Sequence, residues 1–217
     1  MSILFCTPCY GGMVHEAHFR SCLNLKEELT RQGIAHDWLT GRNESLVTRA
    51  RNEMTASFLK TDHSHMMWLD ADIEFEPEHV AKLWNMQADI AVGIYCMKKK
   101  KEQWFAAWMD GKLVKDLDQF GNDPIEVDYA GTGFMMIKRG VIETLVKSSE
   151  SYVGPMGVTP ALYMTPVEDG IFLSEDYFFC KRARGAGFKI TADPTVRLIH
   201  WGQYAFGEDC RQARPAA

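Results

Sequence analysis

Two aspartates that flank a single alanine, Asp70 and Asp72, directly follow a short apolar run at residues 66–69. Such a run is typical of a buried strand that leaves its sheet where the carboxylates begin. Paired carboxylates at a strand end can hold Mg²⁺ or Mn²⁺ through oxygen ligands and leave positions open for a diphosphate. A solvated acidic turn has the same pattern, so the choice between the two depends on the rest of the chain.

Composition predicts one soluble domain. The chain has 217 residues, of which 46% are hydrophobic and 24% charged, and we expect a domain over 1–207 with a polar tail over 208–217. A net charge of -5 argues against general attraction to nucleic acid. We find no apolar segment long enough for a membrane span and no basic leader, and therefore expect a cytoplasmic protein.

The six cysteines are scattered and mostly lie beside apolar residues, which favours reduced thiols over a disulfide framework. Cys6 and Cys9 form a C-x-x-C, and His15 and His18 follow, so a zinc site is an alternative. Only five residues separate Cys9 from His15, whereas finger-like sites use about twelve or more. The spacing therefore argues against zinc.

Strands and helices are expected to alternate through the first 95 residues. Strands are predicted at 3–7, 34–39, 66–69 and 89–95, with amphipathic helices between them. This alternation predicts an α/β fold with a mostly parallel sheet and helices on both faces. Ligands of such sheets bind beyond the carboxyl ends of the strands, so Thr7, Asp70 and Tyr95 should converge on one crevice.

The second half is less regular. Strands are predicted at 125–130, 134–138 and 196–200, and helices after Gly140 and over 173–186. The stretch 149–172 is rich in proline and glycine and is expected to be a long loop that acts as a lid over the site.

With Asp70-Ala71-Asp72 in this setting, the chain resembles the GT-A glycosyltransferases, most closely the short, soluble, family-2-like enzymes of bacteria, phages and large DNA viruses. The resemblance is carried, in order, by Thr7-Pro8, TRARN at 48–52, LDAD at 69–72, VGIYCMKK at 92–99, YAGTGFMMIKR at 129–139, SEDYFFCKRARGAGF at 174–188 and LIHWG at 198–202. It implies a single Rossmann-like GT-A domain.

The resemblance also implies a role for each matching residue. Thr7 and Pro8 would edge the base and ribose of a nucleotide, and Arg51, or else Arg49, would face the nucleotide or its phosphates. Asp70 would contact the ribose or the metal through water. Asp72 and His200 would ligate Mn²⁺ or Mg²⁺ directly.

Three further segments complete the expected site. Gly131-Thr132-Gly133 would let the donor sugar or the acceptor lie against the main chain, because glycine has no side chain. Trp201 is a candidate for stacking on a sugar, and Tyr95 lies at a strand end beside the crevice. Ser174 reads as a helix cap followed by two acids, Glu175 and Asp176. In inverting members of the family the second acid is the base, so Asp176 is the candidate and Glu175 the reserve.

These residues predict metal-dependent transfer of a sugar from a nucleoside diphosphate sugar, with UDP the first choice by family habit, to a hydroxyl of a glycan, lipid or protein acceptor. Three alternatives stay open: a haloacid-dehalogenase-like phosphatase, a sugar nucleotidyltransferase and a non-catalytic sugar-binding module. The first normally carries its acidic motif on the first strand, and the second needs an N-terminal glycine-rich loop with Arg and Lys. The third is opposed by the intact Asp72, Asp176 and His200.

Overall fold

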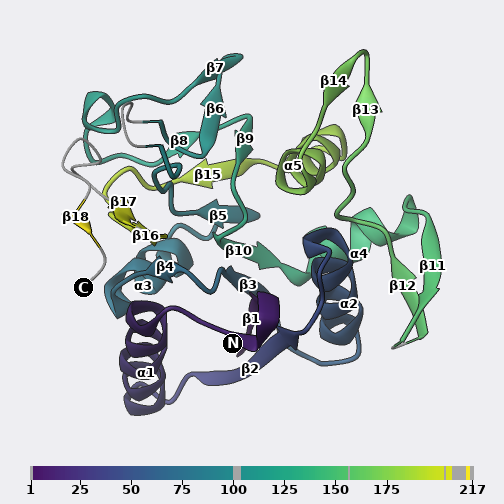
Figure 1. The fold of residues 1–217 in the computed structure, drawn as a ribbon, viewed down its shortest axis with the longest axis horizontal. Coiled ribbons are helices and arrows are strands. Elements are labelled where there is room, and N and C mark those ends of the chain that lie inside the picture. Colours follow the sequence, from purple (N-terminus) through teal and green to yellow (C-terminus); the bar gives the residue numbers. More distant parts are fainter. Residues whose placement is uncertain (1, 100–103, 156, 203, 207–213, 216–217) are drawn as a thin grey trace.

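A seven-stranded sheet forms the centre of the computed structural model, which describes residues 2–99, 104–155, 157–202, 204–206 and 214–215 (Figure 1). The strand order is β2-β1-β3-β10-β5-β15-β8. The strands are β1 (Ser2–Cys9), β2 (Ala35–Arg42), β3 (His65–Leu69), β5 (Ile90–Val92), β8 (Ile125–Glu126), β10 (Phe134–Lys138) and β15 (Ile190–Ala192). Within this sheet β10 and β8 run against the other five strands. The sheet is therefore mostly parallel, as predicted.

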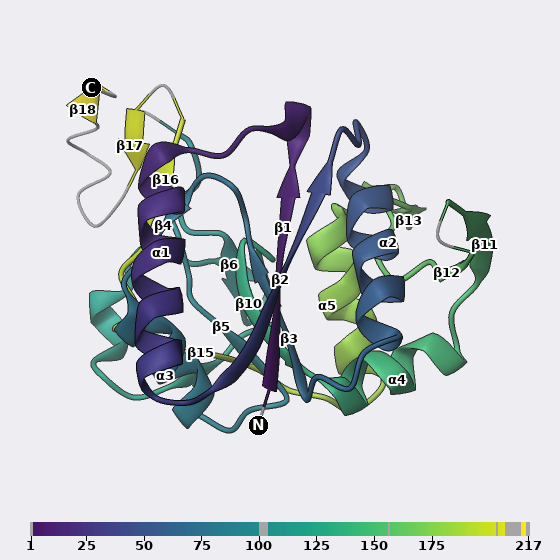
Figure 2. The ribbon, with the colours of Figure 1, turned by 90° about the horizontal axis from the view of Figure 1, so that it is seen from below.

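Helices cover both faces of the sheet (Figure 2). One face carries α1 (Glu16–Arg31) and α3 (Pro77–Asn85), and the other carries α2 (Val47–Leu59), α4 (Arg139–Lys147) and α5 (Glu175–Gly185). Successive strand residues point to opposite faces. Phe5 accordingly joins the core cluster that contains Leu25 of α1, whereas its neighbour Cys6 joins the cluster that contains Phe58 of α2.

Strand β10 enters the sheet between β3 and β5 in the antiparallel sense. It begins directly after Gly131-Thr132-Gly133, on the side of the sheet where β3 ends. It therefore crosses the sheet in the direction opposite to β3. Its register pairs Phe134 with Leu69, and the Asp70 backbone N–H donates to the Gly133 carbonyl at 2.9 Å. The glycine loop is thus held beside the aspartate motif.

Two smaller sheets lie beyond the side of the central sheet where β3 ends and β10 begins. One has the order β18-β17-β16-β4, and the other has the order β7-β6-β9. Their strands are β4 (Ile73–Glu74), β16 (Ile199–Trp201), β17 (Tyr204–Phe206), β18 (Arg214–Pro215), β6 (Ala107–Met109), β7 (Lys112–Leu113) and β9 (Tyr129–Ala130). Pairing of His200 with Ile73 brings β16 beside the aspartate motif. The strand expected at 196–200 lies at Ile199–Trp201.

The stretch 149–172 is not the irregular loop that its proline and glycine content predicts. It forms two hairpins, β11 (Ser151–Gly154) with β12 (Gly157–Pro160) and β13 (Val167–Glu168) with β14 (Ile171–Phe172). Between them Leu162 and Tyr163 are buried, and their backbone N–H groups donate to Oδ1 of Asn52 at 3.0 and 2.8 Å. Backbone pairing and this anchor order the segment, which weakens the argument for a lid.

Cys96 departs from the expectation of reduced thiols, because it is disulfide-bonded. Four others, Cys6, Cys9, Cys22 and Cys180, are free. Most of the polar tail predicted at 208–217 lies outside the described residues, although Arg214–Pro215 pairs with β17. No helix in the described ranges combines the length and the apolar character needed to cross a membrane.

Candidate functional site

A cavity of about 610 Å³ opens at the edge where β1 and β3 end. Six of the residues singled out from the sequence line it, namely Pro8, Arg51, Asp70, Ala71, Asp72 and Trp201. Thr7 is buried and does not line it, and neither does Arg49, which borders a separate hollow of about 260 Å³. Of the three strand-end residues expected to meet in one crevice, only Asp70 lines the cavity. Pro8 takes the place of Thr7 at the cavity wall, and Tyr95 is buried and does not line it.

Asp72 stands between two groups that can carry a positive charge. Its Oδ2 accepts from the Lys98 ammonium at 2.5 Å, and its Oδ1 lies 3.6 Å from Nε2 of His200. Burial would raise the pKa of Asp72, but the contacts with His200 and Lys98 outweigh it and lower the pKa well below its usual value. Asp72 is thus held as a carboxylate.

His200 has the orientation that a metal ligand requires. Its Nδ1 lies 2.9 Å from the Cys96 carbonyl oxygen, which can only accept, so Nδ1 carries the proton in this contact. The lone pair of a neutral ring is then on Nε2, which faces Asp72. A backbone carbonyl that fixes the tautomer in this way is the usual support of a metal-binding histidine.

The donor set fits a divalent cation only in part. Asp72 and His200 supply one carboxylate and one imidazole, whereas both oxygens of Asp70 are bonded to Arg51. Across the described residues no group of three or more His, Cys, Asp and Glu side chains is placed to hold a metal ion. A metal here would therefore take two protein ligands and complete its shell with diphosphate oxygens and water.

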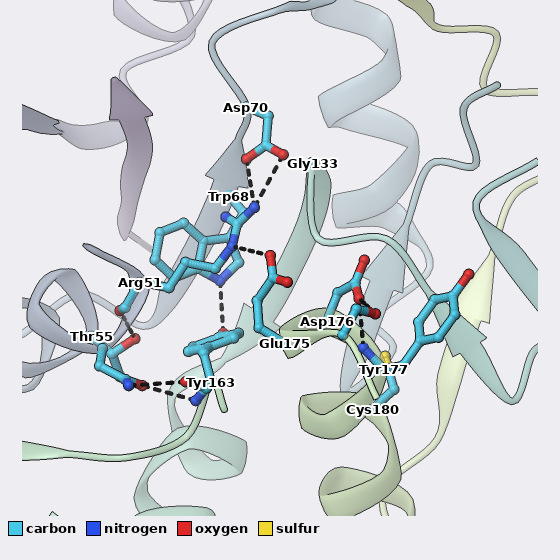
Figure 3. A network of polar contacts seen from close by, with 12 residues as sticks. Arg51, Thr55, Trp68, Asp70, Gly133, Tyr163, Glu175, Asp176, Tyr177 and Cys180 are labelled. Carbon is cyan, nitrogen blue, oxygen red and sulfur yellow. Dashed lines mark hydrogen bonds and ion pairs between the residues drawn. The ribbon is translucent and has the colours of Figure 1, made fainter. Parts of the chain in front are cut away.

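Arg51 of α2 links two acids that lie far apart in the sequence (Figure 3). Its Nη2 donates to Oδ1 and Oδ2 of Asp70 at 2.9 and 3.1 Å, and its Nε donates to Glu175 at 3.5 Å. The guanidinium also lies 5.0 Å from the ring centroid of Trp68, and Arg51 is only 2% exposed. Burial would lower the pKa of Arg51, but Asp70 and Glu175 raise it overall. Arg51 therefore joins β3 to α5 from within the core.

We expect Arg51→Met to lower the free energy of unfolding by about 2 kcal/mol or more, because Asp70 and Glu175 would both lose their cation. Arg49→Met is the matched control on the same helix. Arg49 is 48% exposed and pairs with Glu44, so its loss should cost less than about 1 kcal/mol. Urea unfolding of both variants is the measurement. Equal losses would show that Arg51 does not organise the site.

The glycines of Gly131-Thr132-Gly133 make room for protein atoms. A Cβ at Gly131 would lie 2.2 Å from the Tyr95 hydroxyl oxygen, and a Cβ at Gly133 would lie 2.8 Å from the same oxygen and 3.0 Å from Oδ2 of Asp70. The Tyr95 hydroxyl accepts from the Gly133 N–H at 3.1 Å, and Thr132 is buried. Approach of a donor sugar to this loop stays a prediction, but packing against Tyr95 already explains the glycines.

Gly131→Ala should therefore destabilise the protein by about 1–3 kcal/mol, as overpacking of a tight core usually does. Gly140→Ala offers a matched control in α4, because a Cβ there meets no atom within 4 Å. That change should be neutral or stabilise by up to about 1 kcal/mol, since alanine is the better helix former. Thermal unfolding of the two variants gives the comparison, and a Gly131→Ala variant as stable as wild type would contradict the packing argument.

Glu175 and Asp176 form the first turn of α5 and differ in their surroundings. Glu175 pairs with Arg51, whereas Oδ1 of Asp176 accepts from the Ser174 hydroxyl and, at 2.8 Å, from the Tyr177 N–H. Burial, and after it the charge of Glu175, raises the pKa of Asp176 to about 6. Burial and the charges of Asp70 and Asp176 also raise the pKa of Tyr95. Asp176 thus has the raised pKa of a general base, although it does not line the cavity.

Trp201 is positioned by three contacts. Its ring stacks on His15 with centroids 4.5 Å apart, its Nε1 donates to Glu74 at 2.7 Å, and its backbone N–H donates to the Asp72 carbonyl at 2.8 Å. Because His15 covers one face, a sugar could stack only on the opposite face of the ring.

Sequence reasoning missed several residues that line the cavity. His15 was weighed only as a zinc ligand, yet it is the N-cap of α1 and its backbone N–H donates to the Ala71 carbonyl. Tyr10 and Met13 form an exposed apolar rim. The Gly11-Gly12 pair, which lies between them and has positive φ at both positions, was the available signal for a chain reversal at this rim.

Comparison with known proteins identifies a family for this chain. The model of the Anp1 family matches residues 25–146, which is more than half of the chain and includes the aspartate motif and the glycine loop. The chain belongs to the Anp1 family. No match was found among curated proteins.

Solved structures show the fold of this Anp1 member. A197 from STIV is 20% identical with a TM-score of 0.61, and the match covers 100% of this chain and 95% of A197. GalNAc-T7 with UDP, GalNAc and Mn²⁺ is 10% identical with a TM-score of 0.56, over 99% of this chain and 45% of that one. The catalytic domain of Drosophila beta1,4galactosyltransferase 7 in complex with xylobiose is 12% identical with a TM-score of 0.52, over 90% of this chain and 66% of that one. The fold is therefore GT-A, as the resemblance predicted.

Proposed function

We propose that this protein is a glycosyltransferase that moves a sugar from a nucleoside diphosphate sugar, with UDP as the first candidate nucleotide, to an acceptor hydroxyl. The observation that carries the proposal is the facing pair of Asp72 and His200 beside a cavity large enough for a nucleotide. The structural neighbours support it, because GalNAc-T7 was solved with UDP, GalNAc and Mn²⁺.

Asp72 and His200 would hold Mn²⁺ or Mg²⁺ in this proposal, and such an ion offsets the negative charge that develops on a diphosphate leaving group. Pro8 and the apolar rim would bind the base and ribose. Arg51, buried and paired with two acids, would position Asp70 and Glu175 instead of contacting phosphate freely, which changes the role inferred for it from the sequence.

Asp176 would act as the general base. The acceptor oxygen attacks the anomeric carbon, its proton passes to the Asp176 carboxylate, and the bond between the sugar and the diphosphate breaks with its electron pair on the phosphate oxygen. These steps invert the anomeric configuration of the transferred sugar. The Ser174 hydroxyl and the Tyr177 N–H both donate to Oδ1 of Asp176, so Oδ2 is the oxygen proposed to receive the proton.

A thermal-shift screen of UDP, GDP, ADP and CDP, each with and without Mn²⁺, tests the proposal. One diphosphate together with Mn²⁺ should raise the melting temperature by about 5–10 °C at a hundredfold excess over its Kd, and by much less without the metal. Hydrolysis of the corresponding sugar donor, measured with and without Mn²⁺, then separates a transferase from a phosphatase or a binding module. A protein that no nucleoside diphosphate stabilises would contradict the proposal.

A further inference from the structure

Lys98 lies where a metal bound to Asp72 would need room. Its ammonium is 2.5 Å from Oδ2 of Asp72, and both side chains are 37% exposed in the wall of the cavity. A divalent cation held by Asp72 and His200 would therefore have a positive charge as its neighbour. Like charges at such short range repel, so the ammonium has to leave Asp72 when the metal binds.

The surroundings of Lys98 allow its side chain to move without its backbone. The preceding residues are held, because the Met97 N–H donates to the Trp104 carbonyl at 2.7 Å and the Cys96 carbonyl contacts His200. The side-chain stem runs along Gly202, where a Cβ would lie 3.2 Å from Cδ and 3.5 Å from Cε of the lysine. Gly202 of the LIHWG segment thus leaves space for a long, flexible side chain.

The released ammonium needs an anionic partner. Arg51 also lines the cavity, but its Nη2 and Nε are already bonded to Asp70 and Glu175, and its side chain is 3% exposed. Its Nη1 has no partner among the described residues, but this nitrogen is buried. Among the residues that the structure describes, Asp72 is the only carboxylate paired with Lys98, and it is the residue proposed to bind the metal. A diphosphate held by the same metal would present phosphate oxygens to Lys98 at the cavity wall.

We propose that Lys98 is a diphosphate-binding residue, whose ammonium pairs with Asp72 in this structure and pairs with the phosphates instead when the metal and the nucleotide bind. The proposal rests on the proposed function, since it needs a metal at Asp72 and a diphosphate in the cavity. It has two consequences for affinity. The ammonium of Lys98 should weaken the binding of the metal alone, and it should strengthen the binding of the nucleotide in the presence of the metal.

Isothermal titration calorimetry on the full chain and its Lys98→Met variant tests this assignment. Mn²⁺ alone should bind the variant about three- to tenfold more tightly, because the competing ammonium is gone. UDP at saturating Mn²⁺ should bind it about tenfold more weakly, because a phosphate partner is gone. The affinity for pyrophosphate at saturating Mn²⁺ should weaken by the same factor, since the effect does not involve the nucleobase.

Lys99→Met is the matched control, because the Lys99 ammonium lies 3.3 Å from the ring centroid of Trp104. It should leave both affinities within about twofold of wild type. A Lys98→Met variant whose affinity for Mn²⁺ alone is unchanged or weaker would overturn the proposal for Lys98, while binding of Mn²⁺ and UDP by wild type would keep the proposed function intact. A wild-type protein that binds neither would overturn both.

Discussion

Asp176→Asn is expected to lower the rate of transfer to the acceptor by a factor of at least about 100 while UDP and Mn²⁺ bind nearly as in wild type. The amide keeps the shape of the side chain and can still accept from the Tyr177 N–H, but it cannot take the acceptor proton. Single-turnover transfer and calorimetric binding are the two measurements. Near-normal transfer, or a product that keeps the donor's anomeric configuration, would remove Asp176 as the base.

The same carboxyl predicts a pH dependence. If Asp176 is the base as proposed, its pKa of about 6 means that it becomes protonated as pH falls below 6, so transfer by wild type should decline through that range. Because burial raises this pKa above its ordinary value, the native state binds the proton more tightly than the unfolded chain does. The ionised form therefore costs stability, and this cost grows as pH rises from about 4 to about 6.

Asp176→Asn should accordingly gain stability relative to wild type on going from pH 4 to pH 8, by about 3 kcal/mol at most. Urea unfolding at the two pH values gives the difference. Glu175→Gln serves as the control, because Glu175 is paired with Arg51 and its loss should destabilise the protein instead. A pH-independent effect of Asp176→Asn would show that its carboxyl titrates as an ordinary aspartate.

Asp72→Asn should weaken Mn²⁺-dependent binding of UDP by a factor of about 100 or more. The variant keeps the size of the side chain, and the backbone carbonyl that receives the Trp201 N–H is untouched, so the fold should persist. What it loses is the charged oxygen proposed to ligate the metal, and removal of even an indirect ligand contact costs about 10- to 100-fold in metal affinity.

Asp37→Asn is a suitable control for Asp72→Asn, since Asp37 is 73% exposed on β2 and contacts His63. Circular dichroism of both variants verifies folding, and titration of UDP at several Mn²⁺ concentrations gives the affinity. If Asp72→Asn binds UDP with Mn²⁺ as tightly as wild type does, the metal is held elsewhere.

Much of the fold follows from local patterns. The expected strand at 134–138 coincides with β10. Leu46, Ala50, Met54 and Phe58 recur every four residues and predict a buried helix stripe, and the last three are buried along α2, whereas Leu46 precedes the helix and is 55% exposed. The apolar run before Asp70 is buried in β3, with the acids at its end. These features depend on which residues of a segment face the core, and a period of two or of about 3.6 residues records that directly.

Other local signals in the sequence predicted the observed hairpins, but the composition of the segment outweighed them in the prediction. Asp169 and Gly170 have positive φ, as a tight hairpin turn requires, and an Asp-Gly pair between β-branched and aromatic residues predicts such a turn. The proline and glycine content of 149–172 pointed to a loop instead. Cross-strand pairing, as between Val153 and Val158, gives those residues a regular structure that composition does not reveal.

The sequence by itself determined which residue types are available for the chemistry: a strand-end Asp72, a late His200, and an acidic helix start at Glu175 and Asp176. Only the tertiary structure decided their partners. Arg51 meets Glu175 across 124 positions of sequence, and Lys98 meets Asp72 across 26. The physical reason is that periodicity encodes burial within one segment, whereas an ion pair depends on which segments the sheet order brings together. In the order observed here, Arg51 is buried in the core and Lys98 lies on the proposed metal ligand.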